Sequence, residues 1–131
     1  MAEVTSERFQ DAVEEYLIRH KSVLDVITKF HESASRVNRA VAKSVTTCGC
    51  TEISARRQRC PEDTSFSDFK RHMDTHLYGE LCPECREALE LEIGRTLFYL
   101  TAMCSILDMD MDEIVSKENN RIKALGIFNL T

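Results

Sequence analysis

Four cysteines form two short chelating pairs in this chain, Cys48-x-Cys50 and Cys82-x-x-Cys85. Four thiolates in two such pairs are a donor set that tetrahedral Zn²⁺ accepts. We therefore predict a structural zinc site that ties the segment after the first helices to the start of a later helix, with no coordination position left for catalysis. A Cys3His site, in which His76 replaces one thiolate, is a close variant.

The second pair also permits a redox interpretation. Cys82 is expected just before a helix, where the positive end of the helix dipole lowers a thiol pKa, and Cys85 would resolve a disulfide. A thioredoxin-like βαβ pattern is missing, which disfavours this alternative. A third alternative is unligated thiols in a partly buried loop. Cys60 has no nearby partner in the sequence, and Cys104 is expected in the core.

The composition indicates one helical domain. The chain has 131 residues, of which 43% are apolar and 30% charged, and it contains only two prolines and four glycines. These values are typical of a single globular domain built from helices. We predict one all-α domain over 1–131, a bundle of four to five helices with a cysteine-containing loop inserted at about 46–66.

Apolar periodicity locates these helices. From Phe9 to Val45 apolar residues recur every three or four positions, and a weak capping pair at Ser22 makes this element either one helix or two. A short helix is expected over 67–76, ended by Gly79, and a long one over 84–107. A last helix is expected over 112–125, stopped by Gly126. The buried face of the long helix is predicted to hold Ala88, Leu91, Leu97, Phe98, Thr101 and Cys104 or Met103.

Charge and hydropathy exclude some partners. The net charge of −5 disfavours binding to bulk nucleic acid, because that affinity comes from lysines and arginines that release counterions. The first eight residues lack the features of a signal peptide, and no apolar run is long enough to span a membrane. We expect a cytoplasmic protein without a membrane partner, in which the cysteines are thiols or metal ligands.

A group of motifs in the second half of the chain suggests a family. Glu92-Ile93-Gly94-Arg95 is followed by Leu97-Phe98-Tyr99-Leu100, a turn at 106–110, and a helix with Asn119 or Asn120 and Lys123. This series covers roughly a third of the chain and resembles the second half of the MazG-type all-α nucleoside triphosphate pyrophosphohydrolases. The chain looks like a member of a degenerate or uncharacterised small bacterial branch of that superfamily.

The resemblance implies metal-assisted chemistry that this chain only partly matches. In the family, carboxylate pairs on two helices hold Mg²⁺ against the triphosphate. The first pair would fall on 31–35, where only Glu32 is acidic, and the second keeps Glu92 but has Arg95 in place of an aspartate. A guanidinium cannot ligate Mg²⁺, so the helix is expected to hold an internal charge pair instead. Asn119 and Lys123 correspond to the phosphate-binding residues of the family.

These observations leave open whether the chain is an enzyme. The leading hypothesis is a MazG-like protein without pyrophosphohydrolase activity, acting as a binding or regulatory module with a zinc site and with a nucleotide as one candidate ligand. The alternatives are a Mg²⁺-dependent pyrophosphohydrolase that uses Glu32 and Glu92, and a thiol redox protein. The long amphipathic first element and the resemblance both predict a homo-oligomer, a dimer or a tetramer.

Overall fold

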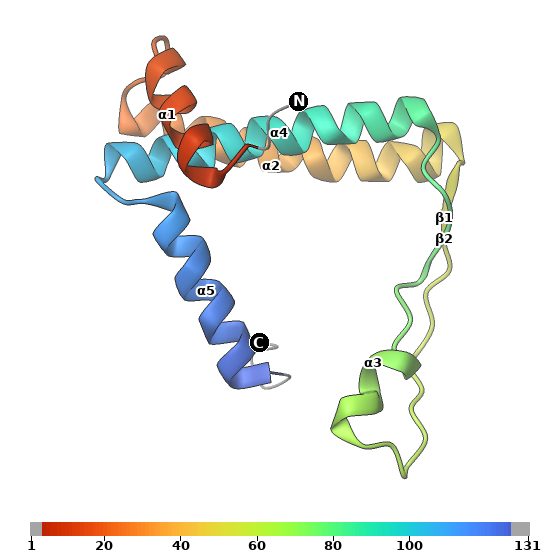
Figure 1. The fold of residues 1–131 in the computed structure, drawn as a ribbon. Helices are drawn as coiled ribbons and strands as arrows, with labels where there is room; N and C mark the ends of the chain where they lie inside the picture. The colour runs from red at the N-terminus through yellow and green to blue at the C-terminus, as the bar shows by residue number, and fades with distance from the viewer. Residues whose placement is uncertain (1–3, 127–131) are drawn as a thin grey trace.

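The computed structural model describes residues 4–126. Within this range the chain is mostly helical, as predicted, and it also contains a two-stranded antiparallel sheet that the sequence did not indicate (Figure 1). None of the described helices is long and apolar enough to cross a membrane. The elements are α1 (Ser6–Tyr16), α2 (Val23–Lys43), β1 (Thr51–Ile53), α3 (Phe69–His72), β2 (Leu77–Gly79), α4 (Pro83–Ile106) and α5 (Met111–Leu125).

The longest elements, α2 and α4, lie side by side and antiparallel, and they form the most extensive contact in the fold (Figure 1). On α2, Val26 and Ser33 are buried. The Ser33 hydroxyl donates to the carbonyl oxygen of Phe30 at 2.8 Å, which satisfies a polar group that burial would otherwise penalise. Helix α1 packs across the far end of α4, and α5 contacts α1 and points away from the pair (Figure 1).

The first apolar stretch forms two helices rather than one. Helix α1 ends at Tyr16, and α2 begins at Val23 with Ser22 as its N-cap. The Ser22 hydroxyl accepts a hydrogen bond from the Leu24 N–H at 3.3 Å, so it satisfies one of the free donors at the helix start. The capping residue that the sequence indicated is therefore the one that starts α2.

The apolar core is small for a chain of this length. It is centred on Val13, Val26 and Ala102, with four partly buried apolar residues packed around it. On the predicted buried face of α4, Thr101 and Cys104 are buried as expected, whereas Ala88, Leu91 and Leu97 are exposed, Leu91 by 55% and Leu97 by 47%. The prediction was wrong at these three residues because α4 has apolar residues on several sides, and its packing against α2 and α1 covers only some of them. The partly buried residues are Phe9, Leu17, Phe98 and Met103.

A buried glutamine joins α1 to the turn between α4 and α5. The Gln10 amide donates to the carbonyl oxygen of Met109 at 2.8 Å and to the Ser105 hydroxyl at 3.1 Å. Its oxygen accepts from the Met111 N–H at 2.8 Å. Asp110 caps α5 by accepting from two N–H groups of its first turn, so the predicted last helix is confirmed.

The segment between the two long helices is an arm, residues 51–79. At its base β1 pairs with β2, with Thr51 opposite Gly79 and Ile53 opposite Leu77. The arm projects from the end of the α2–α4 pair, and α3 lies near its tip (Figure 1). The short helix predicted over 67–76 forms as α3, but it stops at His72, and Gly79 does not end it because that residue belongs to β2.

Gly79 is needed where β2 passes close to the backbone of Cys50. Its φ is +84°, and a Cβ at this position would lie 2.5 Å from the carbonyl oxygen of Cys50. A side chain at this position would therefore strain the backbone and push β1 and β2 apart.

We predict that Gly79→Ala destabilises the protein by about 1–3 kcal/mol, measured by denaturant unfolding. Gly94→Ala is the matched control, because Gly94 lies inside α4 with open space around it. That change should stabilise the protein by about 0.5–1 kcal/mol, since alanine favours the helix more than glycine does. Equal effects of the two substitutions would contradict the close approach at Gly79.

Candidate metal centre

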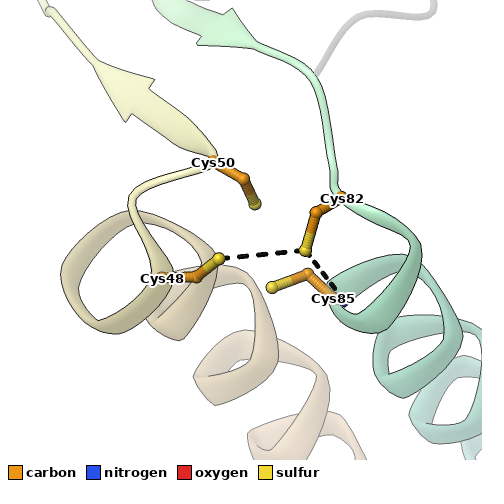
Figure 2. Close-up of side chains that lie close together, drawn as sticks. All are labelled: Cys48, Cys50, Cys82 and Cys85. Carbon is orange, nitrogen blue, oxygen red and sulfur yellow. Dashed lines mark hydrogen bonds between the residues drawn. The ribbon is translucent and has the colours of Figure 1, made fainter.

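The four cysteines singled out by their spacing meet at the end of the α2–α4 pair (Figure 2). Cys48 ends a π-helical turn, Ser44–Cys48, that continues α2, and Cys50 comes directly before β1. Cys82 is the N-cap of α4, and Cys85 lies in its first turn. The four sulfur atoms all lie within 4.8 Å of one another.

The sulfur geometry fits a tetrahedral metal ion. The Sγ atoms of Cys48 and Cys82 are 3.8 Å apart. In a tetrahedral site with Zn–S bonds of about 2.3 Å, neighbouring sulfurs are separated by about 3.8 Å. A disulfide would need about 2.0 Å, and all six cysteines are free thiols. The donor set and its spacing are therefore suited to a four-coordinate zinc ion.

Helix α4 prepares the second pair for metal binding. The N–H of Cys85 donates to the Cys82 sulfur at 3.4 Å, and this bond, together with hydrogen bonds from the neighbouring thiols, lowers the pKa of Cys82 to about 7. The neighbouring Cys82 sulfur, followed by burial, raises the pKa of Cys85 to about 12. One thiol of the group is thus readily ionised and the next resists ionisation, because a second negative charge so close is unfavourable. A cation placed among them would remove that repulsion.

The first pair is shaped by the turn that ends α2. Gly49 has a φ of +78°, and its N–H donates to the carbonyl oxygen of Ser44 at 3.0 Å. The Cys50 thiol points at the same carbonyl at 3.7 Å. The buried hydroxyls of Ser44 and Thr51 lie 2.7 Å apart and join the turn to β1. Neither the π-helical turn nor this hydroxyl pair was recognised from the sequence.

The Cys50 N–H, which has the largest single effect, and the Cys85 thiol both lower the pKa of Cys48, but the hydrogen bonds with the Cys82 and Cys50 thiols and some desolvation together outweigh them. The pKa of Cys48 is therefore raised above the usual value of a thiol. As at Cys85, the pKa is raised because several thiols lie close together.

The other predicted site residues lie apart from this group. His76 comes just before β2 with a φ of +59°, and its carbonyl oxygen accepts from the Ser54 N–H at 3.0 Å. Within residues 4–126, only the four cysteines are grouped closely enough to share a metal ion, and His76 is not among them. Asn119 and Lys123 are exposed on α5.

The two candidate catalytic acids face one groove. Glu32 on α2 and Glu92 on α4 both line a groove of about 670 Å³ that reaches Cys48 and Cys85. Asn119 and Lys123 are not among its lining residues. The structure therefore brings the two acids together but leaves the predicted phosphate-binding residues elsewhere.

Each of these acids is paired with cations of its own helix. Glu32 contacts Arg36 at 2.9 Å and Lys29 at 3.4 Å, and the Arg36 bond in particular lowers the pKa of Glu32. Glu92 contacts Arg95 at 3.1 Å, as the sequence predicted. Cations at these distances occupy carboxylate oxygens that a divalent metal would need, so the groove is poorly suited to Mg²⁺.

A row of cations on α2 went unrecognised in the sequence. Arg36, Arg39 and Lys43 line the groove beside Cys48 and Cys85. Their spacing of three and four residues puts them on one side of the helix, and this spacing was the available signal. Four thiolates and one Zn²⁺ carry a net charge of −2, so cations in the adjoining groove would stabilise the loaded site.

Comparison of the chain with protein-family models, curated proteins and solved structures finds no match. The likeness to the MazG type therefore rests on the motif residues alone.

The uneven thiol pKa values predict uneven reactivity. In metal-free protein near pH 7, Cys82 should react first with an aromatic disulfide reagent, because its pKa of about 7 leaves about half of it as thiolate, a larger share than for an ordinary thiol. The rate should rise with pH through about 7, below the value of about 8.5 for an ordinary thiol. The fast phase should vanish in Cys82→Ser and persist in Cys60→Ser. A single slow phase in all variants would contradict this assignment.

Proposed function

We propose that this chain is a non-catalytic binding module in which a structural Zn²⁺ holds the base of the arm at the end of the α2–α4 pair. The observation that carries the proposal is the convergence of four cysteine sulfurs within 4.8 Å, with one pair at the separation of a tetrahedral edge. Four thiolates complete the coordination of zinc, so the ion would have no position for a substrate or a reactive water.

A zinc ion at this point would supply stability that the arm otherwise lacks. The ribbon at the base pairs only three residues of each strand, and isolated two-stranded ribbons are marginally stable. The ion would join Cys48 and Cys50, before β1, to Cys82 and Cys85, after β2, and so close the arm into a loop. Binding free energy at such a site adds directly to folding free energy.

The arm also has internal contacts that support a defined shape. The Asp74 carboxylate accepts from the Tyr78 hydroxyl at 2.7 Å, from Arg56 at 3.0 Å and from the His76 N–H at 3.0 Å. The Tyr78 bond is the main reason that the pKa of Asp74 is lowered. The Gln58 side chain and the Asp74 backbone exchange two hydrogen bonds across the arm. An element ordered in this way suits the display of a binding surface.

The side chains on the arm are those of a contact surface. Phe69 and Met73 are each 38% exposed, and the cations Arg57, Arg59 and Lys70 are also exposed. Aromatic residues, methionine and arginine are all enriched where proteins bind partners. The arm therefore supports the binding role better than the groove supports catalysis.

Purified protein is predicted to contain one Zn²⁺ per chain by elemental analysis. Cys82→Ser and Cys85→Ser should each lower zinc affinity at least about 100-fold, since loss of a ligand costs no less than loss of an outer-shell partner. Cys60→Ser is the matched control, because Cys60 is a free thiol on the arm outside the four-cysteine group. Its zinc content should not change.

Removal of zinc by a chelator should lower the melting temperature. Free zinc at about 1,000 times its Kd would contribute about 4 kcal/mol to folding. Protein that binds no zinc and cycles readily between dithiol and disulfide would refute the structural site and favour the redox alternative, in which Cys82 attacks and Cys85 resolves.

We also propose that the helical part is a MazG-like scaffold without pyrophosphohydrolase activity. The support is the pairing of Glu32 and Glu92 with cations of their own helices. One observation favours the alternative of a Mg²⁺-dependent hydrolase. Both acids line the same groove, and Oε2 of Glu92 is buried without a hydrogen-bond partner among the described residues.

The absence of activity is tested by pyrophosphate release from ribo- and deoxyribonucleoside triphosphates with Mg²⁺ or Mn²⁺. No turnover above that of the Glu92→Gln variant is expected, because Arg95 occupies one oxygen of Glu92. Turnover that disappears in Glu92→Gln would establish the hydrolase instead. Thermal unfolding of both proteins provides the control that the variant is folded.

A further inference from the structure

The four cysteines of the candidate metal centre differ in how well solvent reaches them. Cys48 is exposed, whereas Cys50, Cys82 and Cys85 are only partly exposed. Cys48 also lines the groove of about 670 Å³ between α2 and α4. A small reagent in solution can therefore reach the Cys48 sulfur while α2 and α4 stay in place.

The Cys48 sulfur is in direct contact with a sulfur from the other cysteine pair. Cys48 ends the turn after α2, and Cys82 is the N-cap of α4. Their Sγ atoms lie 3.8 Å apart (Figure 2). A disulfide needs a separation of about 2.0 Å. Small rotations of the two side chains would close the difference, so the two sulfurs are placed to form a bond.

A zinc ion would change which cysteine reacts first. In a loaded site every ligand sulfur is a thiolate, and the thiolate is the form of cysteine that attacks an oxidant. Ionisation then no longer distinguishes the four sulfurs, and access to solvent does. Cys48 should therefore react first in the loaded protein, whereas Cys82 should react first in metal-free protein.

We propose that Cys48 is an oxidation site, at which hydrogen peroxide displaces the zinc ion and leaves a disulfide between Cys48 and Cys82. This oxidation site depends on the zinc site proposed above. It differs from the redox alternative given there, in which Cys82 and Cys85 form a disulfide in a protein that binds no zinc.

The reaction consumes one molecule of peroxide and no other oxidant. The Cys48 thiolate attacks one peroxide oxygen, the O–O bond breaks and hydroxide leaves, so that Cys48 becomes a sulfenic acid. The Cys82 thiolate then attacks the Cys48 sulfur, and the sulfenic oxygen leaves as a second hydroxide. The two sulfurs lose two electrons in total, and peroxide gains them. Zinc dissociates because only two ligands remain, and Cys50 and Cys85 each take up a proton from solvent.

The charges of the groove favour the first step. Arg39 and Lys43 line the groove together with Cys48, and within residues 4–126 neither cation forms a salt bridge. They outnumber the one acid of the lining without such a pair, Glu84, because the other two acids are paired with cations of their own helices. Positive groups beside the reacting oxygen would stabilise the hydroxide that leaves.

The disulfide would hold the base of the arm in place of the ion. Cys48 precedes β1 and Cys82 follows β2, so a bond between them joins the two ends of the arm. A disulfide between Cys82 and Cys85 would instead join two residues at the start of α4 and leave the arm open. Oxidation through Cys48 therefore releases zinc while the arm stays closed at its base.

The test begins with protein purified with its zinc and treated with a small excess of hydrogen peroxide beside a coloured zinc indicator. We expect release of one Zn²⁺ per chain. Peptide mapping by mass spectrometry without reductant should find Cys48 linked to Cys82. Dithiothreitol and added zinc should restore the loaded protein. Cys60→Ser is the matched control, because Cys60 lies outside the four-cysteine group, and this variant should release the same amount of zinc.

Thermal unfolding gives a second measurement on the unmodified chain. The oxidised protein should melt at a higher temperature than reduced protein stripped of zinc by a chelator, because a cross-link across the whole arm restricts the unfolded chain. A disulfide between Cys82 and Cys85 closes only a very short loop and would give little such gain. Equal melting temperatures would therefore contradict the link between Cys48 and Cys82.

The outcomes separate this proposal from the zinc site itself. Protein that binds no zinc would refute the zinc site and the oxidation site together. Zinc that is bound and stays bound in peroxide would refute only the oxidation site. Zinc release accompanied by a disulfide between Cys82 and Cys85 would overturn the assignment to Cys48 while leaving the zinc site intact.

Discussion

The antiparallel packing of α2 on α4 is the interaction on which the other features depend. Because the two helices run in opposite directions, the end of α2 and the start of α4 lie at the same end of the pair (Figure 1). The turn after α2 and the N-cap of α4 then bring two cysteine pairs together from positions more than thirty residues apart. The same packing also explains why the segment between the two helices forms an arm. That segment leaves α2 and returns to α4 at the same end of the pair.

Charge pairing within each helix limits what the groove can do. Glu32 and Glu92 lie where a metal site would need acids, yet each is paired with a cation one turn away on its own helix. Such local pairs form wherever the sequence provides opposite charges three or four residues apart. The groove is therefore a mixed-charge surface beside the cysteines, while the cysteines themselves are the closest grouping of metal-binding atoms in the described part of the chain.

Several elements were predictable because their signals are local. The N-cap at Ser22, the cap at Asp110 and the extent of α4 follow from residues within one or two turns. The two strands were missed because each has only three paired residues, and their pairing depends on a partner 28 positions away, Thr51 opposite Gly79. Gly79 was misinterpreted as a helix stop for the same reason, since the carbonyl oxygen that requires a glycine belongs to Cys50.

The sequence by itself determined the helical composition, the internal pair of Glu92 with Arg95 and the cysteine donor set, because these depend on spacing along one helix or one turn. Only the tertiary structure decided which side of α4 is covered, that four cysteines rather than His76 are grouped, and that Asn119 and Lys123 lie away from the groove. These outcomes depend on how one helix is placed against another. Apolar residues on several sides of α4 allow more than one placement, so periodicity alone cannot select the side that is buried.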